Sequence, residues 1–239
     1  DQGFLPEALL NYLGRMGWSM PDDREQFSLD EMVEAFDIDR VSLGGPIFDL
    51  EKLTWLNGQW LKNSLTDDEY RTRLMDWMCS DAFFESALPH LRSRIDVFSE
   101  ASQWLSPLWV KEVPITQKAL AELESDTDTL TSMLQYLVWR FENIPSWSRE
   151  AIESEIRWVA DSLALKLRDV MPVVFMALSG TRQAISAFDL AVLLGPDRTL
   201  ARLRSALETA GGLSKKGLKR LEKSYQQACQ SIDTTGDAN

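Results

Sequence analysis

The residues that most often carry catalytic chemistry are few in this chain, and their spacing gives them no partner. Cys79 and Cys229 are the only cysteines, and they stand far apart with no Cys-x-x-Cys pair. This usage is typical of a reducing compartment and excludes a thiolate metal site built from this chain alone. His90 is the only histidine, and a single imidazole completes neither a catalytic triad nor a histidine-rich metal centre. We therefore predict no catalytic and no metal-ligating residues.

Glycines and paired acids, which bind phosphate or metal in other proteins, have simpler explanations here. No strand leads into the Gly44–Pro46 stretch and no Gly-Lys-Ser/Thr follows it, so we expect a turn rather than a phosphate loop. The acid pairs at 22–23 and 67–68 stand at loop or helix-start positions, where capping and the helix dipole account for them. Residue chemistry alone therefore indicates no activity.

Charge is unevenly distributed along the chain. The 239 residues have a net charge of −12, which argues against non-specific nucleic-acid binding by the whole surface. Residues 1–64 hold twelve acids against five bases, whereas residues 197–223 hold eight bases against three acids. A basic end on an acidic body can contact a phosphate backbone, but an exposed helix face that is only solvated explains the same pattern. The eight bases are Arg198, Arg202, Arg204, Lys215, Lys216, Lys219, Arg220 and Lys223.

Hydrophobic periodicity indicates that the chain is helical. Apolar residues recur at helical spacing in many stretches, no stretch alternates as a strand does, and no apolar run approaches the roughly 18 residues of a membrane span. Ser28 to Glu31 and Thr66 to Glu69 have the form of a capping box. We predict an all-α chain of roughly ten helices. Its clearest core stripe is Leu130, Met133, Leu134, Leu137, Val138 and Phe141.

Several expectations concern the second half of the chain. A helix over Phe84–Phe98 puts Arg92 and Arg94 on different faces, and the aromatic, proline-containing stretch 104–114 reads as a connection between subdomains. Met171–Leu178 reads as a short buried segment before a turn. Two short helices on either side of Gly195-Pro196 and a basic helix from Ser214 to about Cys229 follow.

Three long stretches resemble one family and occur in its order. They are Gly3–Ser19 with Pro21–Leu61, then SEASQWLSPLW (Ser99–Trp109), then MALSGTRQAISAFDLAVLLGPDRTLARL (Met176–Leu203). On these stretches the chain is identified as a member of the bacterial-type glutamyl-tRNA synthetases, which are class I aminoacyl-tRNA synthetases. The resemblance reaches from the start of the chain to about Leu207.

The resemblance implies an organisation without the catalytic domain. It implies a stem-contact segment (1–60), two helical anticodon-binding subdomains (61–115 and 116–209) that form a two-part helical cage, and a basic helix with a polar tail (210–239). In the family, ATP with magnesium and glutamate bind an upstream Rossmann-type domain through HIGH-like and KLSKR-like motifs, which this chain lacks. Leu213–Gly217 resembles the second motif only superficially, because it follows the last family stretch. The chain does not begin with Met, and we expect a piece of a longer ligase that is not catalytic alone.

The resemblance also implies the partner, tRNA(Glu), and a residue that reads its anticodon. In the family, the arginine of an R-x-R-[FI]-D segment contacts the third anticodon base, cytosine in tRNA(Glu) and guanine in tRNA(Gln), and relaxed members have glycine there. Here the segment is Arg92-Ser93-Arg94-Ile95-Asp96, and Arg94 takes this position. A guanidinium offers only donors, which match the acceptors of cytosine.

A second anticodon patch is implied around the Ala-Leu-Ser-Gly turn. Counting from that turn, Ala184, Ala187 and Phe188 match positions that contact anticodon bases, although Phe188 as a core anchor is an equal alternative. The chain departs from related enzymes at Phe175, where arginine is frequent, and at Ala184-Ile185, where Thr-Pro is frequent. Candidate contacts to the RNA backbone are Arg198, Arg202, Lys215, Lys216, Lys219 and Arg220.

Two other functions remain open at this stage. One is a free-standing synthetase paralogue that acts as a tRNA-binding or scaffold module, and the other is a helical scaffold without an RNA partner. For the tRNA-binding part of a glutamyl-tRNA synthetase, we expect a cytoplasmic monomer without DNA or membrane partners.

Overall fold

Helices account for the regular structure of this chain. The computed structural model describes residues 3–42, 44–110, 112–123, 125–181 and 185–236. Within these ranges there is no strand, which confirms the predicted all-α class. None of the described helices is long and apolar enough to cross a membrane. The chain divides into two compact units, Asp1–Phe84 and Glu85–Asn239, whereas the four segments expected from the resemblance stay a prediction.

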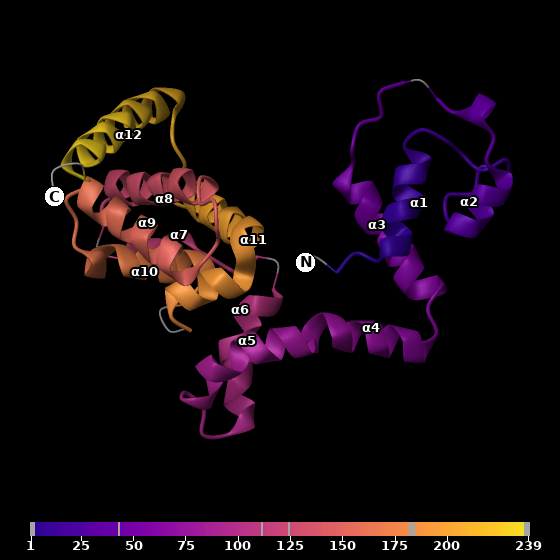
Figure 1. Ribbon diagram of the computed structural model, residues 1–239, viewed down its shortest axis with the longest axis horizontal. Coiled ribbons are helices and arrows are strands. Elements are labelled where there is room, and N and C mark those ends of the chain that lie inside the picture. Colours follow the sequence, from indigo (N-terminus) through magenta and orange to yellow (C-terminus); the bar gives the residue numbers. More distant parts are fainter. Residues whose placement is uncertain (1–2, 43, 111, 124, 182–184, 237–239) are drawn as a thin grey trace. The chain divides into compact units, whose positions relative to one another are not determined.

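The first unit is helical (Figure 1), and three of its helices begin with side-chain caps. Its elements are α1 (Pro6–Arg15), α2 (Leu29–Ala35), the short 3₁₀ helix η1 (Ile38–Arg40), α3 (Leu50–Asn63) and α4 (Asp67–Cys79). Both predicted capping boxes are present, because Ser28 and Glu31 bond reciprocally at α2 and Thr66 and Glu69 do so at α4. Asp49 caps α3 by accepting from the backbone N–H groups of Glu51 and Lys52.

Two long-range contacts hold the first unit together. Tyr12 of α1 packs on Leu53 and Leu56 of α3, so these two helices lie side by side. Arg73 of α4 donates two parallel hydrogen bonds to the carboxylate of Glu7 on α1, at 2.9 and 2.7 Å. This ion pair holds the pKa of Glu7 below its ordinary value.

The second unit is a helical bundle (Figure 1), and the predicted stripe lies in its core. All six residues of that stripe on α8 (Thr127–Glu142) are buried. They pack against α9 (Arg149–Ser162) and α11 (Ala187–Thr209), and α10 (Leu167–Ser179) packs on α11. The other elements are α5 (Asp81–Arg92), η2 (Phe98–Glu100), α6 (Ala101–Trp109), α7 (Gln117–Ala121) and α12 (Lys215–Gly236).

Three predicted element boundaries were wrong. The helix predicted to Phe98 ends at Arg92, so Arg94 lies in a turn beyond the helix, where its N–H donates to Leu91 O at 2.8 Å. The predicted connection 104–114 contains most of α6, because Pro107 lies near the C-terminal end of that helix, with Trp109 the last helical residue. Met171–Leu178 belongs to α10, which ends at Gly180 in the left-handed conformation (φ 70°).

The helix break predicted at Gly195-Pro196 is present as a kink. Gly195 has φ 75° and ψ 170° inside α11, so the two predicted helices are the two arms of one kinked element. Glycine is suited to this conformation because it has no Cβ to clash.

A buried arginine joins three helix ends of the second unit. Arg202 of α11 is 2% exposed. Its guanidinium donates to Leu178 O of α10 at 2.5 Å, and to Pro107 O and Val110 O at the end of α6, both at 2.6 Å. Arg198 donates to Leu108 O and Val110 O at 2.6 and 3.1 Å. The last carbonyls of a helix have no partner within it, so these two arginines satisfy them.

Burial leaves Arg202 charged but confines it. Desolvation, with a smaller effect of Arg198, lowers the pKa of Arg202 to about 10, so the guanidinium stays protonated at neutral pH. A phosphate cannot reach a side chain in this position. We therefore withdraw Arg202 from the predicted RNA-contacting residues, since the structure gives it the role of joining α6, α10 and α11.

Arg202→Met is expected to destabilise the second unit strongly. The change removes the Arg202 donor from the carbonyls of Leu178 and Pro107, whereas Val110 O keeps its bond from Arg198, and the cost is on the order of 3 kcal/mol in the free energy of unfolding. Arg204→Met on the same helix removes only an exposed pair with Glu142, which is worth under about 1 kcal/mol. Urea unfolding followed by circular dichroism compares the two variants, and equal losses would contradict a joining role for Arg202.

Glu7→Gln is expected to lower the stability of the first unit only above acidic pH. The folded pKa of Glu7 lies below its unfolded value, so the stabilisation is present above about pH 4.5 and is lost as pH falls through the folded pKa. Both partners are more than a third exposed, so screening keeps the effect at neutral pH below about 1 kcal/mol. Thermal unfolding between pH 3 and 7 should show the two melting curves converging at low pH. Glu34→Gln, at an exposed carboxylate, should give no such convergence.

Candidate nucleic-acid interface

Arg94 is placed by the end of α5 and by one aromatic ring. Its guanidinium donates to His90 O at 2.7 Å, as cationic side chains near helix C-termini often do. The same group lies 5.8 Å from the ring centroid of Trp104 on α6, within range of a cation–π contact. Arg94 is exposed and forms no ion pair with any residue that the structure describes. Its remaining N–H donors therefore face solvent.

The beginning of α11 lies against the end of α5. His90 Nδ1 of α5 is 3.6 Å from the carboxylate of Asp189, and Arg149 of α9 donates to that carboxylate at 3.0 Å. The Arg149 guanidinium also lies 5.3 Å from the ring centroid of Phe188. The structure thus brings the α5 end that precedes Arg94 and the α11 start that carries Phe188 into one neighbourhood.

The residues predicted for the second patch have different environments. Ala187 is 0% exposed, so its side chain lies in the core and cannot contact a base, which corrects the prediction for this residue. Phe188 is half-buried, with part of its ring accessible. Ala184 lies outside the described residues. Ile185 is fully buried, and Phe175 is half-buried on α10.

The predicted backbone contacts fall into two groups. Arg198 is half-buried and donates to carbonyls like its neighbour Arg202, so neither offers a free guanidinium. The bases of α12 are exposed, and none forms an ion pair with a described residue. These are Lys215, Lys216, Lys219, Arg220 and Lys223.

Helix α12 is docked by one aromatic side chain. Tyr225 packs on Tyr136, Trp139 and Trp158, with ring centroids at 5.0, 4.9 and 5.5 Å. Burial raises the pKa of both Tyr225 and Tyr136, which keeps them neutral. At about 100° per residue, Lys216, Lys219, Arg220 and Lys223 lie on the helix face opposite Tyr225, and Lys215 lies at its side. Docking therefore turns the basic face outward.

Two residues important for the interface could not be assigned from the sequence. Trp104, which lies under Arg94, was expected in a connection, yet it lies on α6. Tyr225 was seen only as part of a basic helix. The helical spacing of Leu221, Tyr225 and Ala228, opposite the bases, is the signal that could have identified the docked face.

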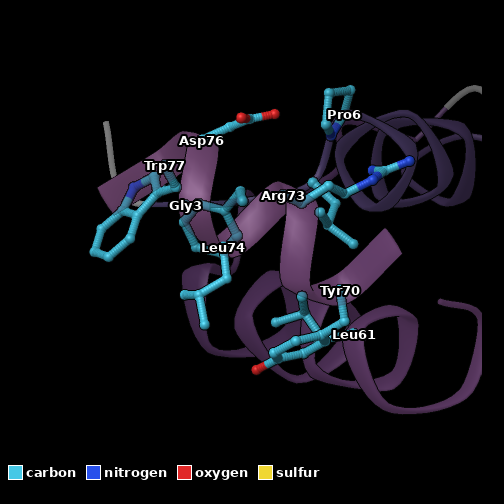
Figure 2. Close-up of a pocket in the computed structure, with 10 residues that line it drawn as sticks. Gly3, Pro6, Leu61, Tyr70, Arg73, Leu74, Asp76 and Trp77 are labelled. Atoms are coloured by element: carbon cyan, nitrogen blue, oxygen red, sulfur yellow. The ribbon is translucent and has the colours of Figure 1, made fainter. Parts of the chain in front are cut away.

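The first unit has a hollow of about 470 Å³ between the Gly3–Pro6 segment and α3 and α4 (Figure 2). Its wall is largely apolar and includes Tyr70, Leu74 and Trp77, each somewhat less than half exposed. Arg73 extends from this hollow toward α1, where Glu7 already matches its charge. Among the described residues, no group of three or more His, Cys, Asp or Glu could hold a metal ion. The hollow thus has no evident chemistry.

Comparison with known proteins adds the family. An anticodon-binding domain model matches residues 68–207, and a model of the catalytic domain of class I tRNA synthetases (E and Q) matches residues 1–55. The chain is 44% identical over 223 residues to the glutamate–tRNA ligase of Marinobacter nauticus, covering 93% of this chain and 45% of that protein. It is 45% identical over 221 residues to the enzyme of Pseudomonas putida strain GB-1, covering 92% and 45%.

A crystal structure of a glutamate tRNA ligase from Elizabethkingia meningosepticum covers 87% of this chain with 25% identity and a TM-score of 0.47, and 42% of that chain is matched. The chain thus spans a little under half the length of the curated relatives that it matches. More than half of its own residues fall within one family model. The chain therefore belongs to the anticodon-binding domain family, preceded by a stretch of the class I glutamate and glutamine tRNA synthetase catalytic domain.

Proposed function

We propose that this chain is the tRNA-recognising part of a glutamate–tRNA ligase and that its second unit reads the anticodon of tRNA(Glu). One observation carries the proposal, namely that Arg94 presents free donors beyond the end of α5, inside the range matched by the anticodon-binding model. Single-stranded loop bases are recognised along their pairing edges, which requires such accessible donors and acceptors.

The chemistry of Arg94 favours cytosine over guanine as the third anticodon base. A guanidinium has five N–H donors, and one is directed at His90 O. The pairing edge of cytosine presents two acceptors, whereas guanine presents two adjacent donors there, so donors would face donors and remain unsatisfied. Trp104 limits the positions that the guanidinium can take, which reduces the entropy lost on binding.

Phe188 and Ala184 complete the proposed anticodon contacts. Phe188 offers part of its ring beside the Arg149 guanidinium, a combination that suits a splayed-out base. Ala184 keeps its proposed place from the resemblance. The buried Ala187 is left out.

The docked basic face of α12 supports a second proposed contact, with the RNA backbone. Its five exposed bases would release counterions from phosphates whatever the sequence of the RNA. This helix lies beyond residue 207, where the family match ends.

For the longer protein we propose ATP-dependent attachment of glutamate to tRNA. The relatives are named glutamate–tRNA ligases, and residues 1–55 match the catalytic-domain model. ATP, magnesium and glutamate would bind to the part of the longer protein outside the present chain, and the catalytic residues would lie there too.

A free-standing tRNA-binding or scaffold module is the second candidate. The observation that favours it is Phe175, because a half-buried phenyl ring cannot donate to a base edge where related enzymes often have arginine. Such a module would bind tRNA without choosing between tRNA(Glu) and tRNA(Gln).

Arg94→Gly is expected to remove discrimination between the two tRNAs. Wild type should bind a tRNA(Glu) transcript more tightly than tRNA(Gln), and the variant should lose about 1–3 kcal/mol of that difference, since one good contact of this kind is worth as much. Fluorescence anisotropy at fixed salt measures both affinities.

Arg94→Lys is the matched control for charge. Lysine keeps the positive charge but lacks the planar fork of donors, so overall affinity should persist while discrimination falls. Equal affinity of the wild-type chain for both tRNAs would reject the discrimination proposal and favour the free-standing module.

Changing the five bases of α12 to glutamine should flatten the salt dependence of tRNA binding. For every phosphate that the helix no longer neutralises, the slope of log K against log salt should fall by roughly 0.7–0.9. Replacing the exposed Arg168 and Lys166 by glutamine serves as a control at a surface not proposed to contact RNA. An unchanged slope would mean that the basic face is only solvated.

A further inference from the structure

Phe98 is an aromatic side chain left almost entirely in water. It is 93% exposed, and its neighbour Val97 is 56% exposed. Among the described residues, the other apolar side chain exposed to a comparable degree is Ile47, an aliphatic residue in the first unit. Single exposed apolar residues are common on protein surfaces, so exposure alone assigns no role. The surroundings of Phe98 give it one.

The backbone that carries Phe98 is held in place by hydrogen bonds. Glu100 N–H donates to Val97 O at 3.0 Å, and the Glu100 carboxylate accepts from Asp96 N–H at 2.9 Å. The N–H of Ala101 donates to Phe98 O, which joins η2 to α6. The ring therefore projects from a fixed turn, so little backbone entropy would be lost when a ligand covers it.

Two exposed arginines precede Phe98 in the chain. Arg92 is the last residue of α5 and Arg94 lies between α5 and η2, and neither forms an ion pair with a described residue. Arg92 also lines a hollow of about 610 Å³ with Leu88 and Pro89 at the end of α5. The acids here are Glu85, which is exposed and lines the same hollow, Asp96, which is exposed, and Glu100, whose carboxylate is already engaged with the backbone. The exposed ring of Phe98, the exposed guanidinium groups and the hollow that Arg92 lines suit a nucleotide, because a nucleotide combines an aromatic face with an anion.

We propose that Phe98 is a stacking platform for an unpaired anticodon-loop base adjacent to the base that Arg94 contacts. This inference rests on the proposed function and deepens it. Every base has an aromatic face, so stacking on Phe98 contributes affinity for an open loop without reading base identity. Arg94 and Phe98 then have separate roles, since the first distinguishes bases and the second holds the loop open beside it.

The test compares the full wild-type chain with its Phe98→Ala variant in binding tRNA(Glu) and tRNA(Gln) transcripts. Removal of the stacking ring should weaken both complexes by about 5- to 150-fold and by the same factor. Phe98→Trp should keep wild-type affinity. Phe98→Leu, which is apolar but not aromatic, should bind as weakly as Phe98→Ala. Val110→Ala is the control for shortening an exposed apolar side chain outside the proposed RNA contacts, and it should bind as the wild type does.

A second measurement identifies the stacked base. A set of transcripts carries one abasic nucleotide each, at successive positions of the anticodon loop. One of them should lower the affinity of wild type but not lower the affinity of Phe98→Ala any further, as a double-mutant cycle requires for direct partners. Circular dichroism should be unchanged in all variants, because the ring has no packing role.

The outcomes separate this inference from the proposed function. If wild type discriminates between the tRNAs and Phe98→Ala binds both with wild-type affinity, the stacking proposal alone is overturned. Full affinity of Phe98→Leu would do the same, since simple apolar contact would then suffice. If Phe98→Ala instead abolished self-association in sedimentation and left RNA binding intact, Phe98 would face a second copy of the chain. Absence of any tRNA binding by wild type would overturn both proposals.

Discussion

The buried guanidinium of Arg202 is the constraint on which the second unit depends. Helix ends leave carbonyls without partners, and burying them without donors costs free energy. Arg202 supplies donors to α6 and α10 from α11, and Arg198 shares the Val110 carbonyl with it. Because α6 carries Trp104 and begins directly after η2, this joint also determines where Arg94 and Phe98 are presented. A largely buried interaction thus positions the most exposed groups of the candidate interface.

Local signals made much of the fold predictable. Capping boxes, the α8 stripe and the glycine kink depend on residues within a few positions of one another, so the sequence alone specifies them. The role of Arg202 could not be found in this way, since its acceptors on α6 lie more than ninety positions earlier in the chain. Arg202 is one of eight bases in residues 197–223, and the basic charge of that stretch is why a contact with the RNA backbone was predicted for it. The end of α5 was missed because the stretch after Arg92 is apolar enough to continue a helix pattern.

The candidate site was predictable only in part, for a geometric reason. Arg94 was identified from the resemblance, and its exposure is compatible with that assignment. Ala187 and Phe188 were identified by counting from a turn, and one step along a helix rotates a side chain by about 100°. That single step separates a buried alanine from a half-accessible ring. Phe98 was overlooked because an apolar residue in a predicted helix is usually a core residue.

The three proposed kinds of RNA contact differ in what they can distinguish. Phosphate contacts by α12 are the same for every tRNA, and stacking on Phe98 is nearly so, because all bases have an aromatic face. Neither can select tRNA(Glu), however much affinity it supplies. A chain with a net charge of −12 also limits binding to the surfaces where bases are gathered. Selection must then come from a group whose interaction changes sign between bases, and a guanidinium facing acceptors in one base and donors in another has that property. The position of Arg94, outside the helix and against Trp104, gives this group both access and a limited range of orientations.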